Sequence, residues 1–211
     1  MPLHQTYSQE SFTVAVWKVE ESIDELRAMF ADFSPYEEAF SRFTSAKRKL
    51  EWLAVRALLK ELCGEEKDIV YLPSGKPCLK EGSASVSFSH TPGYVAVAYS
   101  EKGEVAVDIE QYGTRVQRVA PKFIRDDERI SVQAGDETYA LLLHWSAKET
   151  LFKLLDEEGV DFIEHLHILP FVPSSEGRML AEEYRTDKHS SLPIHYHTHP
   201  DFVLTYAFMP W

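Results

Sequence analysis

Two acidic side chains on one segment could hold a cation. Asp108 and Glu110 belong to residues 104–110, EVAVDIE, which alternate as a β-strand does. Because residues two apart on a strand project from the same face, the two carboxylates would repel each other. A hard divalent cation removes that repulsion, and Mg²⁺ prefers carboxylate and phosphate oxygens. The same pattern is also typical of a solvated acidic strand edge.

A second group of charged residues lies on the segment 145–153, WSAKETLFK. Glu149 and Lys153 are four residues apart, so they share one face of a helix. A surface ion pair worth about 0.2–0.5 kcal/mol has the same spacing. Trp145 and Phe152 are expected to belong to the core.

Two further positions suit anion binding. Lys76 lies in the turn Gly75-Lys76-Pro77, where a lysine can meet a phosphate as a point charge. The complete phosphate-loop pattern with its second glycine and Ser or Thr is not present. Ser89 and His90 are expected at a strand end, where binding residues often lie.

The elements that must position these residues follow from periodicity. Helices are predicted over 21–32, 45–62, 115–125 and 138–155. Strands are predicted over 12–19, 84–88, 94–99, 104–110, 160–169, 178–185, 192–198 and 202–208. Ser45 is expected to cap the second helix and Gly64 to end it. The order of elements predicts an α+β fold with two packed halves, 1–103 and 104–211.

Composition narrows the classes of function. The 211 residues are 44% hydrophobic and 27% charged, which is typical of a globular protein. The formal net charge of −12 argues against broad nucleic-acid binding. No apolar run approaches the roughly 20 residues of a membrane span, and the first residues do not resemble a signal peptide. We therefore expect a cytoplasmic protein with Cys63 and Cys78 reduced.

The order of these motifs carries a resemblance. The chain runs GKP at 75–77, FSH at 88–90, VDIE at 107–110 and WSAKETLFK at 145–153. This series resembles the 4'-phosphopantetheinyl transferase superfamily, specifically its surfactin-type members. The apolar segment 202–207 also resembles the last strand of that family.

The resemblance implies a pseudo-twofold pair of similar α+β halves with coenzyme A in the cleft between them. It implies that Asp108, Glu110 and Glu149 bind Mg²⁺. It also implies contacts with coenzyme A phosphates from Lys76, Ser89, His90, Lys148 and Lys153. Two departures are visible: Ala106 replaces a frequent glycine, and no basic residue near the N-terminus matches the family's pattern.

The implied activity is transfer of the phosphopantetheine arm to a serine of an acyl or peptidyl carrier protein, with release of 3',5'-ADP. Glu149 would take the serine proton, Lys153 would protonate or screen the leaving phosphate, and Asp108 would serve the metal site. The alternatives are a coenzyme A-binding member without transferase activity and a Mg²⁺-dependent nucleotide phosphohydrolase. Two fused halves favour a monomer.

Carrier domains of this kind are typically acidic, so a basic face on this protein would suit them. Arg115, Arg118, Lys122 and Arg125 are spaced three, four and three apart and would line one face of a helix. We expect this face to dock the carrier by electrostatic steering, although a solvated face paired with the acids at 126–128 has the same pattern.

One histidine cluster stands apart from these motifs. His195, His197 and His199 alternate, so on a strand they would share a face. Three such imidazoles can bind zinc or nickel. We favour an exposed or partly packed strand, because the family has no matching role for them.

Overall fold

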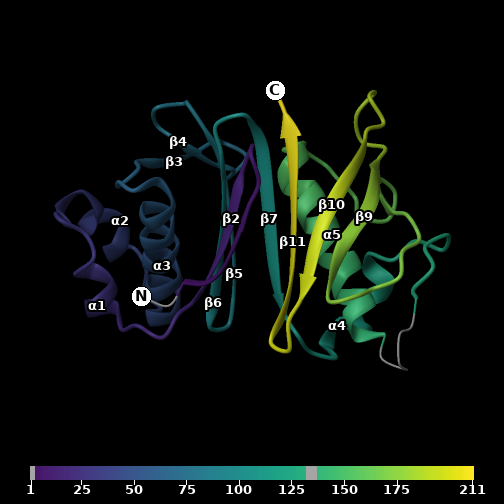
Figure 1. Ribbon diagram of the computed structural model, residues 1–211, viewed down its shortest axis with the longest axis horizontal. Coiled ribbons are helices and arrows are strands. Elements are labelled where there is room, and N and C mark those ends of the chain that lie inside the picture. The colour runs from purple at the N-terminus through teal and green to yellow at the C-terminus, as the bar shows by residue number, and fades with distance from the viewer. Residues whose placement is uncertain (1–2, 132–136) are drawn as a thin grey trace.

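A computed structural model describes residues 3–131 and 137–211, and among them it contains two large antiparallel sheets, one two-stranded sheet and two long helices. Each long helix packs on the outer face of one sheet, and the inner faces of the two sheets meet (Figure 1). The result is four layers, ordered helix, sheet, sheet, helix. Among the described residues, no helix combines the length and apolar character needed to cross a membrane.

The first sheet contains four strands. In spatial order they are β1 (Leu3–Ser8), β2 (Thr13–Lys18), β6 (Tyr94–Ser100) and β5 (Ser85–Thr91). Helix α3 (Ala46–Cys63) covers this sheet; Ser45 Oγ caps it by accepting from Arg48 N, and Gly64 ends it at φ 72°. Short elements complete this half: α1 (Ile23–Arg27), η1 (Ser34–Tyr36), α2 (Glu37–Ser41), β3 (Ile69–Tyr71) and β4 (Pro77–Leu79).

The second sheet contains five strands. They are β7 (Gly103–Gln111), β11 (Phe202–Pro210), β10 (Ser191–Thr198), β9 (Glu176–Glu183) and β8 (Leu166–Ile168). Helix α5 (Thr138–Leu155) covers it and ends at Asp156, at φ 52°. The short helices α4 (Arg115–Val119) and η2 (Ala120–Lys122) follow β7.

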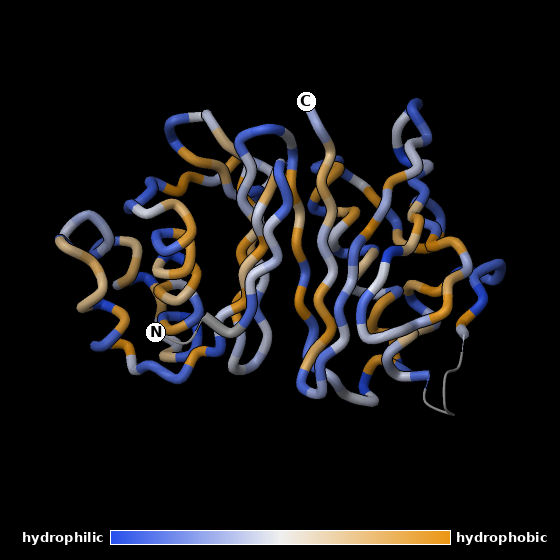
Figure 2. Tube along the Cα trace, viewed as in Figure 1, coloured by the Kyte–Doolittle hydropathy of each residue, from blue (hydrophilic) through white to orange (hydrophobic). Residues whose placement is uncertain are grey.

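Strand alternation explains the layers. On β7, Val105, Val107 and Ile109 face the first sheet, whereas Ala106 faces the core under α5. On β2, Val14 faces the second sheet and Ala15 the core under α3. Apolar residues accordingly follow the central strands in Figure 2. Each inner strand thus has two buried faces, which makes its composition almost wholly apolar.

The two sheets also meet edge to edge through side-chain hydroxyl groups. Hydroxyls of β5 accept hydrogen bonds of 2.9–3.2 Å from backbone N–H groups of β7. The pairs are Ser85 with Val105, Ser87 with Val107, Ser89 with Ile109 and Thr91 with Gln111. We call this row the hydroxyl ladder. It satisfies the edge amides of β7 where no backbone partner is adjacent.

Several boundaries differ from the sequence expectations. The predicted helix 21–32 is helical only over Ile23–Arg27, and the predicted helix 115–125 ends at Lys122. The predicted strand 160–169 is a strand only at Leu166–Ile168, and β1 was not predicted. Strand β5 continues to Thr91, so Ser89 and His90 lie within a strand, beyond the predicted end at residue 88. A short turn with Gly93 at φ 80° is sufficient to join β5 to β6.

β7 begins at Gly103, next to the predicted boundary between the halves. Each half contains one large sheet and one 18-residue helix, and the first half also contains the two-stranded sheet of β3 and β4. A pseudo-twofold relation between them stays a prediction.

Candidate active site

A cleft of about 960 Å³ lies between the two halves. Helix α3, strand β5 and the turn 73–77 line one side, and the end of α5 with residues 156–160 lines the other. Lys76, His90 and Lys153 are among the lining residues. The cleft therefore joins the two groups of motifs that lie far apart in the sequence.

Asp108 lies behind Lys153, on the face of β7 that packs against α5. Asp108 is 4% exposed. Oδ1 accepts hydrogen bonds from Ser89 Oγ at 2.9 Å and from Lys153 Nζ at 2.8 Å. Oδ2 accepts one from Ser146 Oγ at 2.8 Å. The carboxylate is held by three donors from two elements, β5 and α5, so its orientation is fixed before any ligand binds.

A row of buried hydroxyls supports Asp108 from behind. Ser146 and Thr205 share a hydrogen bond of 2.8 Å, and Thr205 and Thr150 share one of 2.7 Å. All three side chains are fully buried. The row links α5 to β11, and it ends on the metal-candidate carboxylate.

Glu110 and Glu149 complete the acidic group. Trp145 Nε1 donates to Glu110 Oε1 at 2.7 Å. Burial and the charge of Asp108 raise the pKa of Glu110, against the effect of the Trp145 bond. Burial and the charge of Asp108 raise the pKa of Glu149 to about 7, while Lys153 acts in the opposite direction. The charge of Asp108 thus acts on both glutamates, which indicates that the three carboxyl groups lie close together.

This donor set fits a hard divalent cation, because its ligands would be carboxylate oxygens whose mutual repulsion a cation relieves. Among residues 3–131 and 137–211, however, no three acidic, histidine or cysteine side chains already form a metal-holding group. The Lys153 ammonium is the cation that pairs with Asp108 in this structure. Metal binding at these residues therefore requires Lys153 to share or release Asp108.

The opposite wall of the cleft carries the first-half residues. Lys76 Nζ pairs with Glu104 Oε2 at 2.9 Å. Arg48 Nη1 donates to His90 Nε2 at 2.8 Å, and Glu51 Oε2 lies 3.6 Å from His90 Nδ1. Burial lowers the pKa of His90, against the charge of Glu51. These cationic groups suit an anionic ligand lying in the cleft.

Sequence reasoning missed part of this wall. Arg56 is 8% exposed, and its guanidinium lies 3.5 Å from the Trp52 ring centroid. Arg48, Trp52 and Arg56 all line the cleft. The basic face of the segment 45–62 was the available signal, but spacing alone could not distinguish its cleft residues from its solvated ones.

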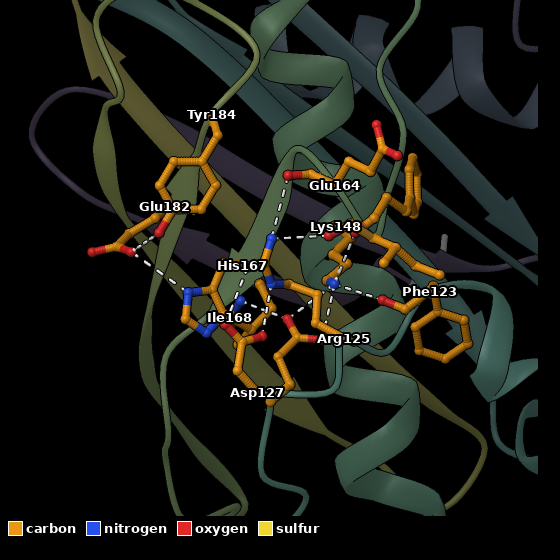
Figure 3. A network of polar contacts seen from close by, with 12 residues as sticks. Phe123, Arg125, Asp127, Lys148, Glu164, His167, Ile168, Glu182 and Tyr184 are labelled. Atoms are coloured by element: carbon orange, nitrogen blue, oxygen red, sulfur yellow. Dashed lines mark hydrogen bonds and ion pairs between the residues drawn. The ribbon is translucent and has the colours of Figure 1, made fainter.

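Lys148 is not in the cleft. Its side chain is fully buried, and it pairs with Glu128 at 2.9 Å. Figure 3 shows Lys148 beside Phe123. Adjacent helical positions project about 100° apart, so Lys148 faces away from the side of α5 that bears Glu149. The structure thus brings Lys76, His90 and Lys153 to the cleft, holds Ser89 on Asp108, and leaves Lys148 in the core.

The predicted basic face is divided. Arg115, Arg118 and Lys122 are exposed on α4 and η2. Arg125 lies beyond the helical region, where it pairs with Asp127 at 2.8 Å and donates to Ile163 O at 2.9 Å. The expected continuous face of four residues therefore contains three, because the helix ends before Arg125.

The three histidines lie against aromatic rings. His197 stacks on Tyr7 with centroids 3.9 Å apart, and His195 stacks on Tyr206 at 5.3 Å. His199 lies beyond the end of β10 and stacks on Phe202. Within the described part of the chain, no metal-holding group includes them.

Comparison with known proteins bears on the half of the molecule that contains the acidic group. No curated protein matches the chain. The segment from β7 to β11, residues 104–207, matches the model of the 4'-phosphopantetheinyl transferase superfamily, which supports phosphopantetheinyl transfer in general and a transferase as the class of enzyme.

Proposed function

We propose that the protein transfers the 4'-phosphopantetheine arm of coenzyme A to a serine of an acyl or peptidyl carrier protein, as a holo-[acyl-carrier-protein] synthase of the surfactin type. The observation that carries the proposal is the group Asp108, Glu110 and Glu149 beside a cleft with cationic residues on both walls. The match over residues 104–207 supports it. One chain supplies both walls, so we propose a monomer, located in the cytoplasm.

In this proposal, coenzyme A lies in the cleft. Lys76, Arg48 and His90 would contact its phosphates from one wall, and Lys153 from the other. Asp108, Glu110 and Glu149 would hold Mg²⁺, which supplies charge neutralisation at the pyrophosphate oxygens. Ser89 would hold Asp108 in position, and its hydroxyl would also contact the coenzyme A phosphates.

The chemical step breaks one bond and forms one. The carrier serine Oγ attacks the phosphorus that bears the pantetheine arm, and the bridging oxygen leaves with 3',5'-ADP. Glu149 would accept the serine proton, directly or through a water. The Lys153 ammonium would neutralise the leaving phosphate.

The carrier would dock on the exposed cations of α4 and η2, Arg115, Arg118 and Lys122. These residues follow β7 directly, so a carrier bound there would lie near the end of the strand that bears Asp108 and Glu110. Arg125 is left out of this face because its guanidinium is already paired.

The test is mass spectrometry of a panel of apo carrier proteins after incubation with coenzyme A and Mg²⁺. We expect a phosphopantetheine mass gain with the wild-type protein and at least a hundredfold slower gain with Asp108→Asn. Asp187→Ala, on an exposed turn, is the matched control and should behave as the wild type.

Other results would identify the alternatives. Coenzyme A binding without a mass gain on any carrier would indicate a binding protein. Release of 3',5'-ADP from coenzyme A in the absence of a carrier would indicate a phosphohydrolase.

A further inference from the structure

Lys148 joins three segments of the second half. Its Nζ donates to Phe123 O at 2.5 Å, to Glu128 Oε2 at 2.9 Å and to Phe162 O at 3.0 Å. A lysine ammonium has three N–H donors, so these partners use all of them. Lys148 therefore has no donor left for another partner. Because its side chain is fully buried, it also cannot reach a ligand in the cleft.

Glu128 completes the contact from the other side. Its side chain is also fully buried. Oε1 accepts from Ile168 N at 2.7 Å, and Oε2 accepts from Arg125 N at 2.8 Å. The carboxylate therefore fixes the backbone of the segment 125–128 against β8.

Arg125 extends the same network toward the surface. Nη1 donates to Ile163 O at 2.9 Å and Glu164 O at 3.3 Å, and the guanidinium pairs with Asp127. Figure 3 shows these contacts converging between α5 and the two loop segments. Lys148 thus ties segments 123–128 and 161–168 to α5, and Arg125 ties the two segments to each other.

We infer that Lys148 is a positioning residue, which together with Glu128 fixes the segment that follows η2 to the helix bearing Glu149. The segment begins one residue after Lys122, so its anchorage sets where the exposed cations of α4 and η2 lie relative to the acidic group. Resting on the proposed function, the inference assigns Lys148 to the placement of the carrier-docking face and not to coenzyme A.

Glu128 distinguishes this role from phosphate binding. If Lys148 bound coenzyme A, replacing it would weaken the affinity of the protein for coenzyme A. Replacing its buried partner Glu128 should not cause the same loss. If Lys148 is a positioning residue, replacing Lys148 and replacing Glu128 should have the same effect, because either change breaks the same contact. The two variants combined should then be no worse than the more damaging one alone.

The experiment compares Lys148→Met, Glu128→Gln and the double variant with the wild type. Lys188→Met, on an exposed turn, is the matched control. Hydrogen exchange reports the anchorage of segments 123–128 and 161–168. Calorimetry with coenzyme A and kinetics with a carrier report binding and docking separately.

We expect exchange in both segments to become at least tenfold faster in all three variants. The Kd for coenzyme A should change less than threefold, while KM for the carrier rises at least fivefold. A tenfold weaker coenzyme A affinity in Lys148→Met alone, with Glu128→Gln unchanged, would overturn the inference. So would exchange within threefold of the wild type in Glu128→Gln, which keeps the size of the side chain and tests the contact even if Lys148→Met does not fold.

Failure of the proposed function gives a different result. A wild-type protein that modifies no carrier would refute the transferase. The exchange measurement requires no substrate, so it would still decide whether Lys148 and Glu128 anchor the two segments.

Discussion

Asp108 illustrates how a single buried carboxyl group is held in one orientation. It receives hydrogen bonds from two hydroxyls and one ammonium, one from β5 and two from α5. A buried carboxylate without such partners would be neutralised or would destabilise the fold. The donors therefore serve the fold and the proposed metal site together.

Ser146→Ala tests this support. The change leaves Asp108 Oδ2 and Thr205 Oγ1 each without one hydrogen bond in a fully buried location. We expect the free energy of unfolding to fall by about 1–3 kcal/mol, measured by urea denaturation. Ser41→Ala, an exposed serine in α2, should change it by less than about 0.5 kcal/mol. Equal stability of the two variants would show that the hydroxyl does not support Asp108.

His144 predicts a pH dependence of stability. Its ring is 1% exposed; Nδ1 bonds Ala140 O, and Nε2 has no hydrogen-bond partner in the described residues. Burial lowers its pKa from 6.5; Glu128 acts against this, and Lys148 and His167 act with it. Below pH 6.5 the unfolded chain binds a proton that the folded chain does not, so stability falls as the pH falls.

We therefore expect the free energy of unfolding between pH 6.5 and 5 to fall less steeply in His144→Gln than in the wild type. The difference in slope can reach about 1.4 kcal/mol per pH unit, the value for one proton. Denaturant titrations at several pH values measure it. Parallel curves would mean that His144 is protonated in the folded protein.

At the scale of elements, the hydroxyl ladder explains the sequence of β5. SVSFSHT places Val86 and Phe88 toward α3 and small hydroxyl side chains toward β7. Larger side chains at the serine positions would separate the two strands, and apolar ones would leave buried N–H groups unpaired. The alternation therefore supplies apolar side chains to the core on one face and hydroxyl groups to the junction between the halves on the other.

Ser87→Ala tests the ladder away from Asp108. Val107 N loses the partner that it has at 3.1 Å, so we expect a loss of about 1–3 kcal/mol in the free energy of unfolding. Ser175→Ala, on an exposed loop, is the control. Chemical denaturation followed by tryptophan fluorescence measures both. A loss no larger than that of the control would mean that water replaces the hydroxyl without cost.

At the scale of the whole molecule, charge distribution matters more than net charge. The chain carries −12, which would repel an acidic partner at long range. Arg115, Arg118 and Lys122 form a local exception on α4 and η2. Such a patch acts mainly on the rate of association and weakens with salt.

We expect Arg118→Glu combined with Lys122→Glu to raise KM for the carrier at least tenfold at low salt, with the Kd for coenzyme A unchanged. The difference from the wild type should shrink at higher ionic strength because salt screens exposed charges. Lys80→Glu with Lys188→Glu makes the same change in net charge on other elements. If both double variants raise KM equally, net charge and not this face determines docking.

Local sequence patterns were sufficient to predict most elements and the chemical character of the acidic group. Alternation placed Asp108 and Glu110 on one face of a strand, and helical periodicity gave α3 and α5 nearly residue for residue. These features depend on neighbours along the chain, so local patterns record them.

Tertiary structure decided which charged residues share a cleft and which support it. Lys148 and Glu149 are adjacent charged residues of the same motif. Lys148 is nevertheless buried with Glu128, whereas Glu149 belongs to the acidic group. Arg48 on helix α3 contacts His90 on strand β5, which lies 42 positions later in the sequence. Such contacts depend on how the sheets and helices pack, and the partner of a buried charge lies on another element, where no local spacing reveals it.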